Sequence, residues 1–130
     1  MLSITQPKII EEIHLEYLKA GADIIETNTF SSTSIGMADY QMEDLAYELN
    51  YEGAKITKEP ASFYFEKTPE KKRYVAGSIG PTNKTASMSP DVNDPGFRAV
   101  TFDDLVKAYK VQVLGLIDGG LDVFFCRNYF

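Results

Sequence analysis

The residues best suited to chemistry follow two apolar stretches of the chain. Asn28 and Thr29 come directly after the first stretch, and Gly80-Pro81-Thr82-Asn83 follows the second. Amide and hydroxyl groups can hydrogen-bond a polar substrate, and small residues let a substrate approach the backbone. We therefore take Asn28, Thr29, Gly80, Pro81, Thr82 and Asn83 as candidate substrate-binding residues.

Each of these candidates also has a purely structural interpretation. Glu26 and Asn28 alternate onto one face of a strand, where they could form a buried polar network that holds the following loop. Gly80 and Pro81 could simply shape a tight turn. We favour the structural role for Glu26, and both interpretations stay open for Asn28.

We assign no catalytic and no metal-binding residue within this chain. A zinc site needs at least three protein ligands, and the chain has one cysteine, Cys126, and one histidine, His14. His14 falls on a predicted helix far from any strand end, so we expect it at the surface or at its boundary. Cys126 is expected to be a small buried apolar residue and not a reactive thiol.

Three apolar strands are expected to position these residues. They are predicted over residues 22–27, 73–79 and 121–126, and their apolar residues on both faces are typical of buried parallel strands. A long segment, residues 80–100, is rich in proline, asparagine and aspartate and is predicted to be a loop.

A helix is predicted before each strand. The first opens at Pro7 and closes at Gly21, and the second covers roughly residues 35–58 and is broken by Pro60. The third starts from a capping box at Thr101 and ends at Gly119-Gly120. Alternating helices and strands predict an α/β fold with right-handed crossovers.

Length and composition limit the function classes. The 130 residues allow one ordinary domain, and a net charge of −6 argues against binding to nucleic acid or to anionic membranes. No apolar run approaches the ~20 residues needed to span a bilayer. The absence of a signal peptide at the start and the single cysteine fit a cytoplasmic location.

Several phrases in this order carry a family resemblance. Residues 20–33 contain "TNTF", residues 74–85 contain "GPTN", and residues 38–40, 89–92 and 101–103 add shorter matches. Together they closely resemble the homocysteine-binding domain of cobalamin-dependent methionine synthase, within the homocysteine S-methyltransferase family. The likeness runs from about Ser3 to about Val123.

The resemblance implies a (β/α)8 TIM barrel, which takes ~250 residues. The chain, residues 1–130, would be a partial domain with about three parallel strands, the second to fourth, and their flanking helices. In the complete enzyme, zinc held by three cysteines on later strands activates homocysteine, and methylcobalamin donates the methyl group. The implied partners are homocysteine, the remaining barrel strands, and the folate and cobalamin domains, while this segment itself binds no cofactor.

The resemblance fails at one place. The family's fourth strand ends in a Glu-Thr pair whose glutamate receives the substrate's ammonium group, and Arg127 and Asn128 stand at these positions. An arginine repels an ammonium group but can pair with a carboxylate.

Two other interpretations remain. The chain could be a truncated, inactive remnant or an interaction module, since the two hydrophobic edges of an open parallel sheet favour self-association. Alternatively, a small flavodoxin-like binding protein would have helices on both faces of its sheet.

Overall fold

A computed structural model describes residues 1–127, so the expectations for Asn128, Tyr129 and Phe130 lie outside the described residues. The strands are β1 (Ile24–Glu26), β2 (Tyr74–Ile79) and β3 (Val123–Cys126). The helices are α1 (Leu2–Thr5), α2 (Pro7–Lys19), α3 (Ser34–Ala38), the short 3-10 helix η1 (Glu43–Leu45), α4 (Ala46–Lys67) and α5 (Phe102–Asp118).

The three strands form one parallel sheet in the order β1-β2-β3. Ile25 lies opposite Val75, and Gly77 lies opposite Phe124. Each strand is linked to the next through a helix, as expected for βαβ units. The predicted α/β class with three parallel strands is confirmed.

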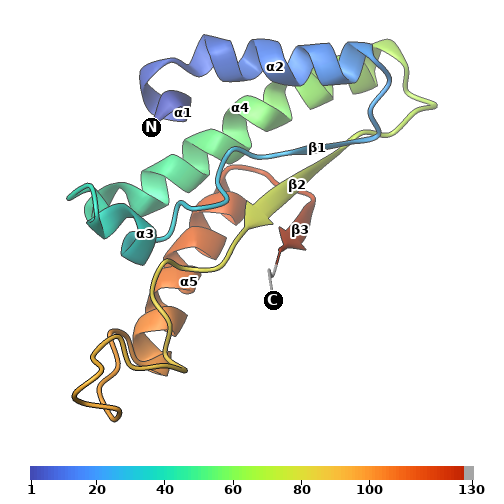
Figure 1. Cartoon of the computed structure of the whole chain (residues 1–130). Coiled ribbons are helices and arrows are strands. Elements are labelled where there is room, and N and C mark those ends of the chain that lie inside the picture. The colour runs from blue at the N-terminus through green and yellow to red at the C-terminus, as the bar shows by residue number, and fades with distance from the viewer. Residues whose placement is uncertain (128–130) are drawn as a thin grey trace.

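Helices cover only one face of this sheet within the described chain. In Figure 1, α4 and α5 lie behind the strands and α2 runs along the outer side of β1. The core on the helix side contains Leu18, Ile25, Ala61 and Val75. The opposite face exposes Ile24, Tyr74, Val123 and Phe125, each by at least 40 %. A flavodoxin-like sheet would bury both faces, so this alternative does not describe the structure.

The predicted helix boundary signals are present. Pro7 occupies the first turn of α2, and the Thr101 side chain forms a capping box with Asp104 at the start of α5. Gly21 and Gly120 have φ angles of 97° and 98°, the left-handed conformation that glycine adopts without strain after a helix.

The prediction of a single helix over residues 35–58 was wrong. α3 ends at Ala38, and Gln41 adopts a φ of 56° in the turn that follows. This turn lets α3 pack against α5, whereas a straight helix would carry these residues away from the sheet.

The expectation that Pro60 breaks the helix was also wrong. Pro60 lies inside α4, which continues to Lys67. A proline inside a helix loses one backbone hydrogen bond and strains the preceding turn. Here Pro60 and the adjacent Ala61 are both buried, and the packing of this turn offsets that cost.

Glycines bring α4 and α5 into backbone contact. A Cβ atom added at Gly115 would lie 2.6 Å from the carbonyl oxygen of Tyr47 and 2.9 Å from Cβ of Asn50. This close approach fixes where α5 stands, and α5 supplies two of the polar side chains that support the loops at the strand ends.

The segment over residues 80–100 forms the predicted loop and extends away from the rest of the chain (Figure 1). Among the described residues, no helix combines the length and the apolar character that a membrane crossing requires.

Candidate functional site

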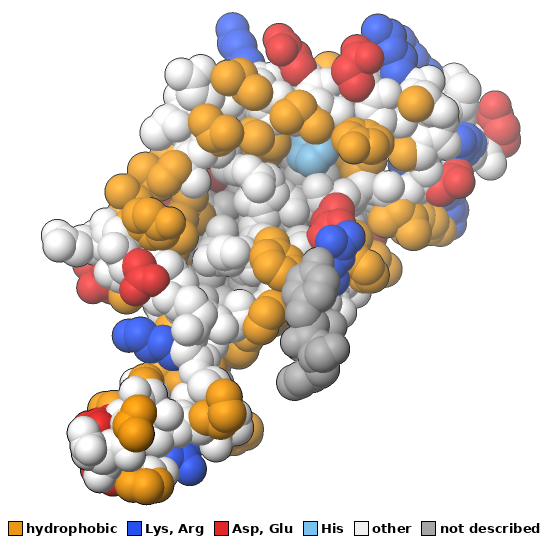
Figure 2. All heavy atoms as spheres, viewed as in Figure 1, with side chains coloured by type: hydrophobic (Ala, Val, Ile, Leu, Met, Phe, Trp, Pro, Cys, Tyr) orange, Lys and Arg blue, Asp and Glu red, His pale blue; other side chains and the backbone are white. Residues whose placement is uncertain are grey.

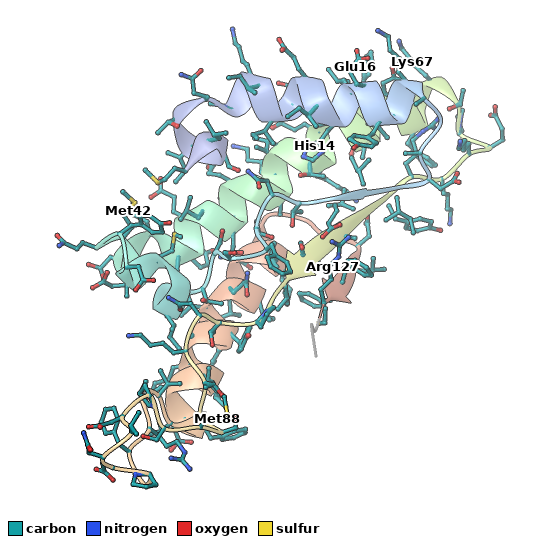
Figure 3. The ribbon with its side chains drawn as sticks, viewed as in Figure 1. His14, Glu16, Met42, Lys67, Met88 and Arg127 are labelled. Atoms are coloured by element: carbon teal, nitrogen blue, oxygen red, sulfur yellow. The ribbon has the colours of Figure 1, made fainter. Side chains whose placement is uncertain are left out.

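A polar network crosses the open face of the sheet near the carboxyl ends of the strands. The hydroxyl of Ser78 on β2 donates a hydrogen bond to Oε1 of Glu26 on β1. From the end of β3, Nη2 of Arg127 donates to Oε2 of the same carboxylate at 3.2 Å (Figure 3). Glu26 therefore does belong to a polar network, but its partners are Ser78 and Arg127 and not Asn28, and its side chain is 35 % exposed, so the buried network of Glu26 and Asn28 that we favoured is not the one observed.

Arg127 is held in place by two further interactions. Its backbone N–H donates to the carbonyl of Ile79 at 2.9 Å, which extends the ladder between β2 and β3. Its guanidinium lies 5.1 Å from the centre of the Phe125 ring, a cation–π distance. The open face thus presents one cation and one anion side by side.

Thr29 anchors the loop after β1. Its hydroxyl donates to the carbonyl of Ser78 at 2.8 Å and accepts from the hydroxyl of Thr27 at 2.6 Å. The Thr27 hydroxyl in turn accepts from the backbone N–H of Ser78 at 3.0 Å. From α5, the side-chain amide of Gln112 donates to the carbonyl of Thr29 at 2.8 Å. Thr29 is fully buried, so it positions its neighbours.

Asn28 is the accessible residue of this loop. Its side chain is exposed and makes no hydrogen bond within residues 1–127. It also lines the hollow between α2 and β1. An exposed amide at the end of a parallel strand is free to bind a polar ligand.

Packing explains the glycine at position 80. A Cβ atom there would lie 2.6 Å from the Phe30 ring, and the Gly80 N–H donates to the Phe30 carbonyl at 3.0 Å. The hydroxyl of Tyr109 donates to the Gly80 carbonyl at 2.8 Å. Pro81 follows and is exposed. The turn geometry is therefore established, and the proposed ligand contact at Gly80 and Pro81 stays a prediction.

Thr82 and Asn83 continue this turn toward solvent. The Thr82 hydroxyl donates to the Lys84 carbonyl, and the Asn83 amide donates to the Asp39 carboxylate. Burial raises the pKa of Tyr109, and the backbone hydrogen bond from Thr82, which favours the phenolate, offsets this only in part. Tyr109 stays protonated at neutral pH and can keep donating to the turn.

The structure therefore brings the two predicted loops together through Phe30, Ser78 and Thr29. Sequence reasoning missed Ser78, Tyr109 and Gln112. Ser78 lies two residues before Gly80. Because every second residue of a strand faces the same side, this spacing could have indicated that Ser78 belongs to the same site as Gly80. Tyr109 and Gln112 are three residues apart and therefore lie next to each other on the helix, within a surface that is otherwise apolar. Polar side chains on an apolar helix surface also indicate buried hydrogen bonds.

His14 is buried, contrary to the expected surface or boundary position. Its side chain is 6 % exposed, and Nε2 lies 2.9 Å from the hydroxyl of Thr57 on α4. That hydroxyl already donates to the Gly53 carbonyl at 2.7 Å, so His14 must donate through Nε2–H. The hydrogen bond to Thr57, 43 residues away in the sequence, allows this polar ring to be buried between α2 and α4.

The expectation of a buried Cys126 was wrong as well. Cys126 is exposed because it lies on the outer strand β3, which has no further neighbour within the described residues. Between residues 1 and 127, no three histidine, cysteine or acidic side chains gather in a way that could hold a metal ion. The residues present therefore do not fit a zinc centre.

Comparison with known proteins adds a family and a fold. The family model described as homocysteine S-methyltransferase matches residues 1–130. The crystal structure of the homocysteine methyltransferase MmuM from Escherichia coli, metallated form, superimposes with a TM-score of 0.75 at 24 % identity. The match covers 96 % of this chain and 43 % of that one.

Two further MmuM structures agree with this result. The oxidized form gives a TM-score of 0.72 at 22 % identity, with 95 % of this chain and 42 % of that chain covered. The apo form gives 0.63 at 20 % identity, with 95 % and 40 % covered. The chain spans less than half the length of these matched structures, and its fold is that of a partial TIM-barrel-like arc.

Proposed function

This chain belongs to the homocysteine S-methyltransferase family, and we propose that it forms part of the homocysteine pocket of a cobalamin-dependent methionine synthase. The family supports a methyltransferase reaction that takes homocysteine. The "TNTF" and "GPTN" phrases support the finer assignment to methionine synthase. Both phrases lie at the carboxyl ends of neighbouring strands, where parallel α/β folds carry their chemistry.

The observation that carries this proposal is the set of accessible polar groups on the open face of the sheet. Asn28 is exposed and lies beside Glu26, while Thr82 and Asn83 border the next strand end. Thr29 and Gly80, both buried, hold the two loops that present these groups. We assign substrate contact to Asn28, Thr82 and Asn83 and support of the loops to Thr29, Gly80 and Pro81.

The neighbouring charges suit an amino acid. Homocysteine carries an ammonium group and a carboxylate, and Arg127 and Glu26 offer one complementary charge each. Glu26 accepts one hydrogen bond on each oxygen and has lone pairs left, and Arg127 uses one of its N–H donors on Glu26. We assign the substrate carboxylate to Arg127 and the ammonium group to Glu26. In the family a glutamate at the position of Arg127 receives the ammonium group, and here Glu26 would take over that role.

Thiol activation lies outside this segment in the proposal. A thiol with a pKa of ~8.5 is a weak nucleophile at neutral pH, and a zinc ion would lower that pKa. The described residues supply no zinc site, so we derive no step through the metal or through methylcobalamin. The chain's own residues bind and orient the amino acid, and the remaining strands and the folate and cobalamin domains would complete the enzyme. A cytoplasmic location is part of this proposal.

Ligand titration by nuclear magnetic resonance tests the pocket. We expect L-homocysteine to shift the amide signals of Asn28, Thr82 and Asn83 in the 130-residue chain, with weak, millimolar affinity. Asn28→Ala should reduce these shifts, and Val92→Ala, at a fully exposed loop position, should leave them unchanged. Shifts confined to other regions, or none at saturating ligand, would overturn the proposal.

A further inference from the structure

Ser78 holds one of the two oxygens of the Glu26 carboxylate. Its hydroxyl donates to Oε1, while Arg127 donates one hydrogen bond to the other oxygen, from Nη2 to Oε2 at 3.2 Å. Figure 2 shows acidic and basic side chains side by side on this face of the molecule. Ser78 is 1 % exposed, in contrast to the two charged side chains. It is therefore placed to support the charged pair and not to touch a ligand.

A closed ring of hydrogen bonds fixes the backbone of Ser78. Its N–H donates to the hydroxyl of Thr27 at 3.0 Å, and that hydroxyl donates to the hydroxyl of Thr29 at 2.6 Å. The Thr29 hydroxyl donates back to the Ser78 carbonyl at 2.8 Å. All three residues are at most 4 % exposed. Hydrogen bonds in such a ring polarise and strengthen one another, so Ser78 holds Glu26 from a fixed position.

Without this support, the two charges would favour a different arrangement. Arginine and a carboxylate pair best through two parallel hydrogen bonds, which join two N–H groups to the two oxygens. The observed contact uses one nitrogen, and its 3.2 Å is longer than the ~2.7–2.9 Å of a strong charge-assisted hydrogen bond. Because Ser78 holds Oε1, the carboxylate does not turn fully onto Arg127. The other N–H groups of the guanidinium then stay available to a ligand carboxylate.

From these contacts we propose that Ser78 is a positioning residue that determines recognition of the ligand's amino group. The proposal rests on the function proposed above, in which Glu26 receives the ammonium group and Arg127 the carboxylate. Ser78 acts through Glu26. It keeps the two charged side chains from neutralising each other completely, so that an amino acid with both charges can bind between them.

Ligand titrations of Ser78→Ala test this role, with L-homocysteine and with 4-mercaptobutanoate, which lacks the ammonium group. In the variant, Glu26 should turn onto Arg127, so both ligands lose access to the guanidinium. L-Homocysteine alone also loses its ammonium acceptor. We expect its affinity to fall by about tenfold or more, as for the loss of a charge-assisted hydrogen bond. The preference of the wild type for L-homocysteine over 4-mercaptobutanoate should fall toward one, measured at the amide signals of Asn28 and Asn83.

Two control variants separate this role from a loss of stability. Ala61→Gly removes a buried methyl group from the core around Leu18 and Val75 and weakens α4. It should lower the urea midpoint and leave the preference between the two ligands unchanged. Ser62→Ala removes a hydroxyl from an exposed position of α4 and should change neither quantity. A Ser78 that served stability alone would make Ser78→Ala resemble Ala61→Gly.

A measurement without ligand reports on the Glu26–Arg127 pair itself. A guanidinium held at two points turns more slowly about its Cζ–Nε bond than one held at a single point, because two hydrogen bonds must break together. Nuclear magnetic resonance of the Nη groups should therefore show slower rotation for Arg127 in Ser78→Ala than in the wild type. Arg98, which donates to backbone carbonyls in the long loop, should be unchanged.

The possible results distinguish this inference from the function on which it rests. A wild-type chain that binds neither ligand at Asn28 and Asn83 would overturn the proposed function, and the role of Ser78 with it. Wild-type binding with an unchanged preference in Ser78→Ala, or with no slowing of Arg127, would overturn the role of Ser78 alone. A lost preference together with slower rotation of Arg127 is the result that supports it.

Discussion

Arg127 at the end of β3 and Glu26 at the end of β1 are joined across the open face of the sheet, with Nη2 and Oε2 3.2 Å apart. The two residues are 101 positions apart in the sequence and are separated in space by β2. Ser78 on β2 bonds to the same carboxylate, so all three strands contribute one side chain. Because both charged side chains are more than a third exposed, solvent screens the pair.

The Glu26–Arg127 pair should add little to stability. We expect a double-mutant cycle with Glu26→Gln and Arg127→Met to give a coupling energy of about 0–1 kcal/mol in urea unfolding. Lys19 and Glu16, an exposed pair on α2, provide a control cycle of the same kind. A coupling of several kcal/mol would show that the pair holds the sheet together, which would argue against a binding role.

The charge at position 127 should set which end of the ligand is recognised. In the wild type we expect L-homocysteine to bind more tightly than 4-mercaptobutanoate, which lacks the ammonium group, because Arg127 pairs with the carboxylate of both ligands and Glu26 pairs with the ammonium group of L-homocysteine alone. In Arg127→Glu the ligand carboxylate loses its partner and two protein carboxylates face the ammonium group, so 4-mercaptobutanoate should lose more affinity than L-homocysteine and the preference for L-homocysteine should increase. Titrations followed at Asn28 and Asn83 measure both affinities. An unchanged preference in Arg127→Glu would remove position 127 from the site.

Close helix contact makes Gly115 intolerant of a side chain. Alanine favours a helix over glycine by about 1 kcal/mol, but its Cβ atom would collide with the Tyr47 carbonyl and with Asn50. We expect Gly115→Ala to lower the free energy of unfolding by about 1–3 kcal/mol, because overpacking outweighs propensity. Thermal or urea unfolding measures this change.

The matched control for this substitution lies in the long loop. A Cβ atom at Gly96 would meet its nearest neighbour, an Asp94 oxygen, at 3.4 Å, which is an ordinary contact. Gly96→Ala should therefore change stability by no more than about 0.5 kcal/mol. Equal effects at the two glycines would show that α4 and α5 can move apart freely.

Local signals in the sequence predicted the elements well. Pro7, Gly21, the capping box at Thr101 and Gly120 each act through a few neighbouring residues, and the structure confirms all four. The apolar character of the strands predicted a parallel sheet, which pairing in the order β1-β2-β3 confirms.

Contacts between distant parts of the chain explain the errors. Pro60 stays inside α4 because the helical turn around it packs into the protein interior. The residues next to Pro60 in the sequence do not reveal this packing. Cys126 is exposed because of its place at the outer edge of the sheet, which residue type does not reveal. The candidate residues lie at the ends of β1 and β2, as expected, but Ser78, Tyr109 and Gln112 contact the same loops through partners 29 to 83 residues away.

His14 should make stability depend on pH in the weakly acidic range. Burial lowers the pKa of His14 from its ordinary value of 6.5, and in the neutral form the ring donates to Thr57. The unfolded chain therefore takes up this proton at a higher pH than the folded chain does. Stability should be highest above pH 6.5 and should fall as the pH drops below it, by at most about 1.4 kcal/mol per pH unit, until the folded histidine is also protonated.

Urea unfolding between pH 7 and pH 5 measures this slope, and His14→Gln provides the comparison. Glutamine can still donate an N–H to Thr57 but cannot be protonated, and the chain has no other histidine. The variant should therefore lose most of the slope in this range, even where its stability at pH 7 differs from that of the wild type. Equal slopes in the two proteins would mean that carboxylates and not His14 control the acid sensitivity. A reduced slope would show that protonation of this single ring opposes folding, because the buried contact of His14 with Thr57 between α2 and α4 holds the neutral form.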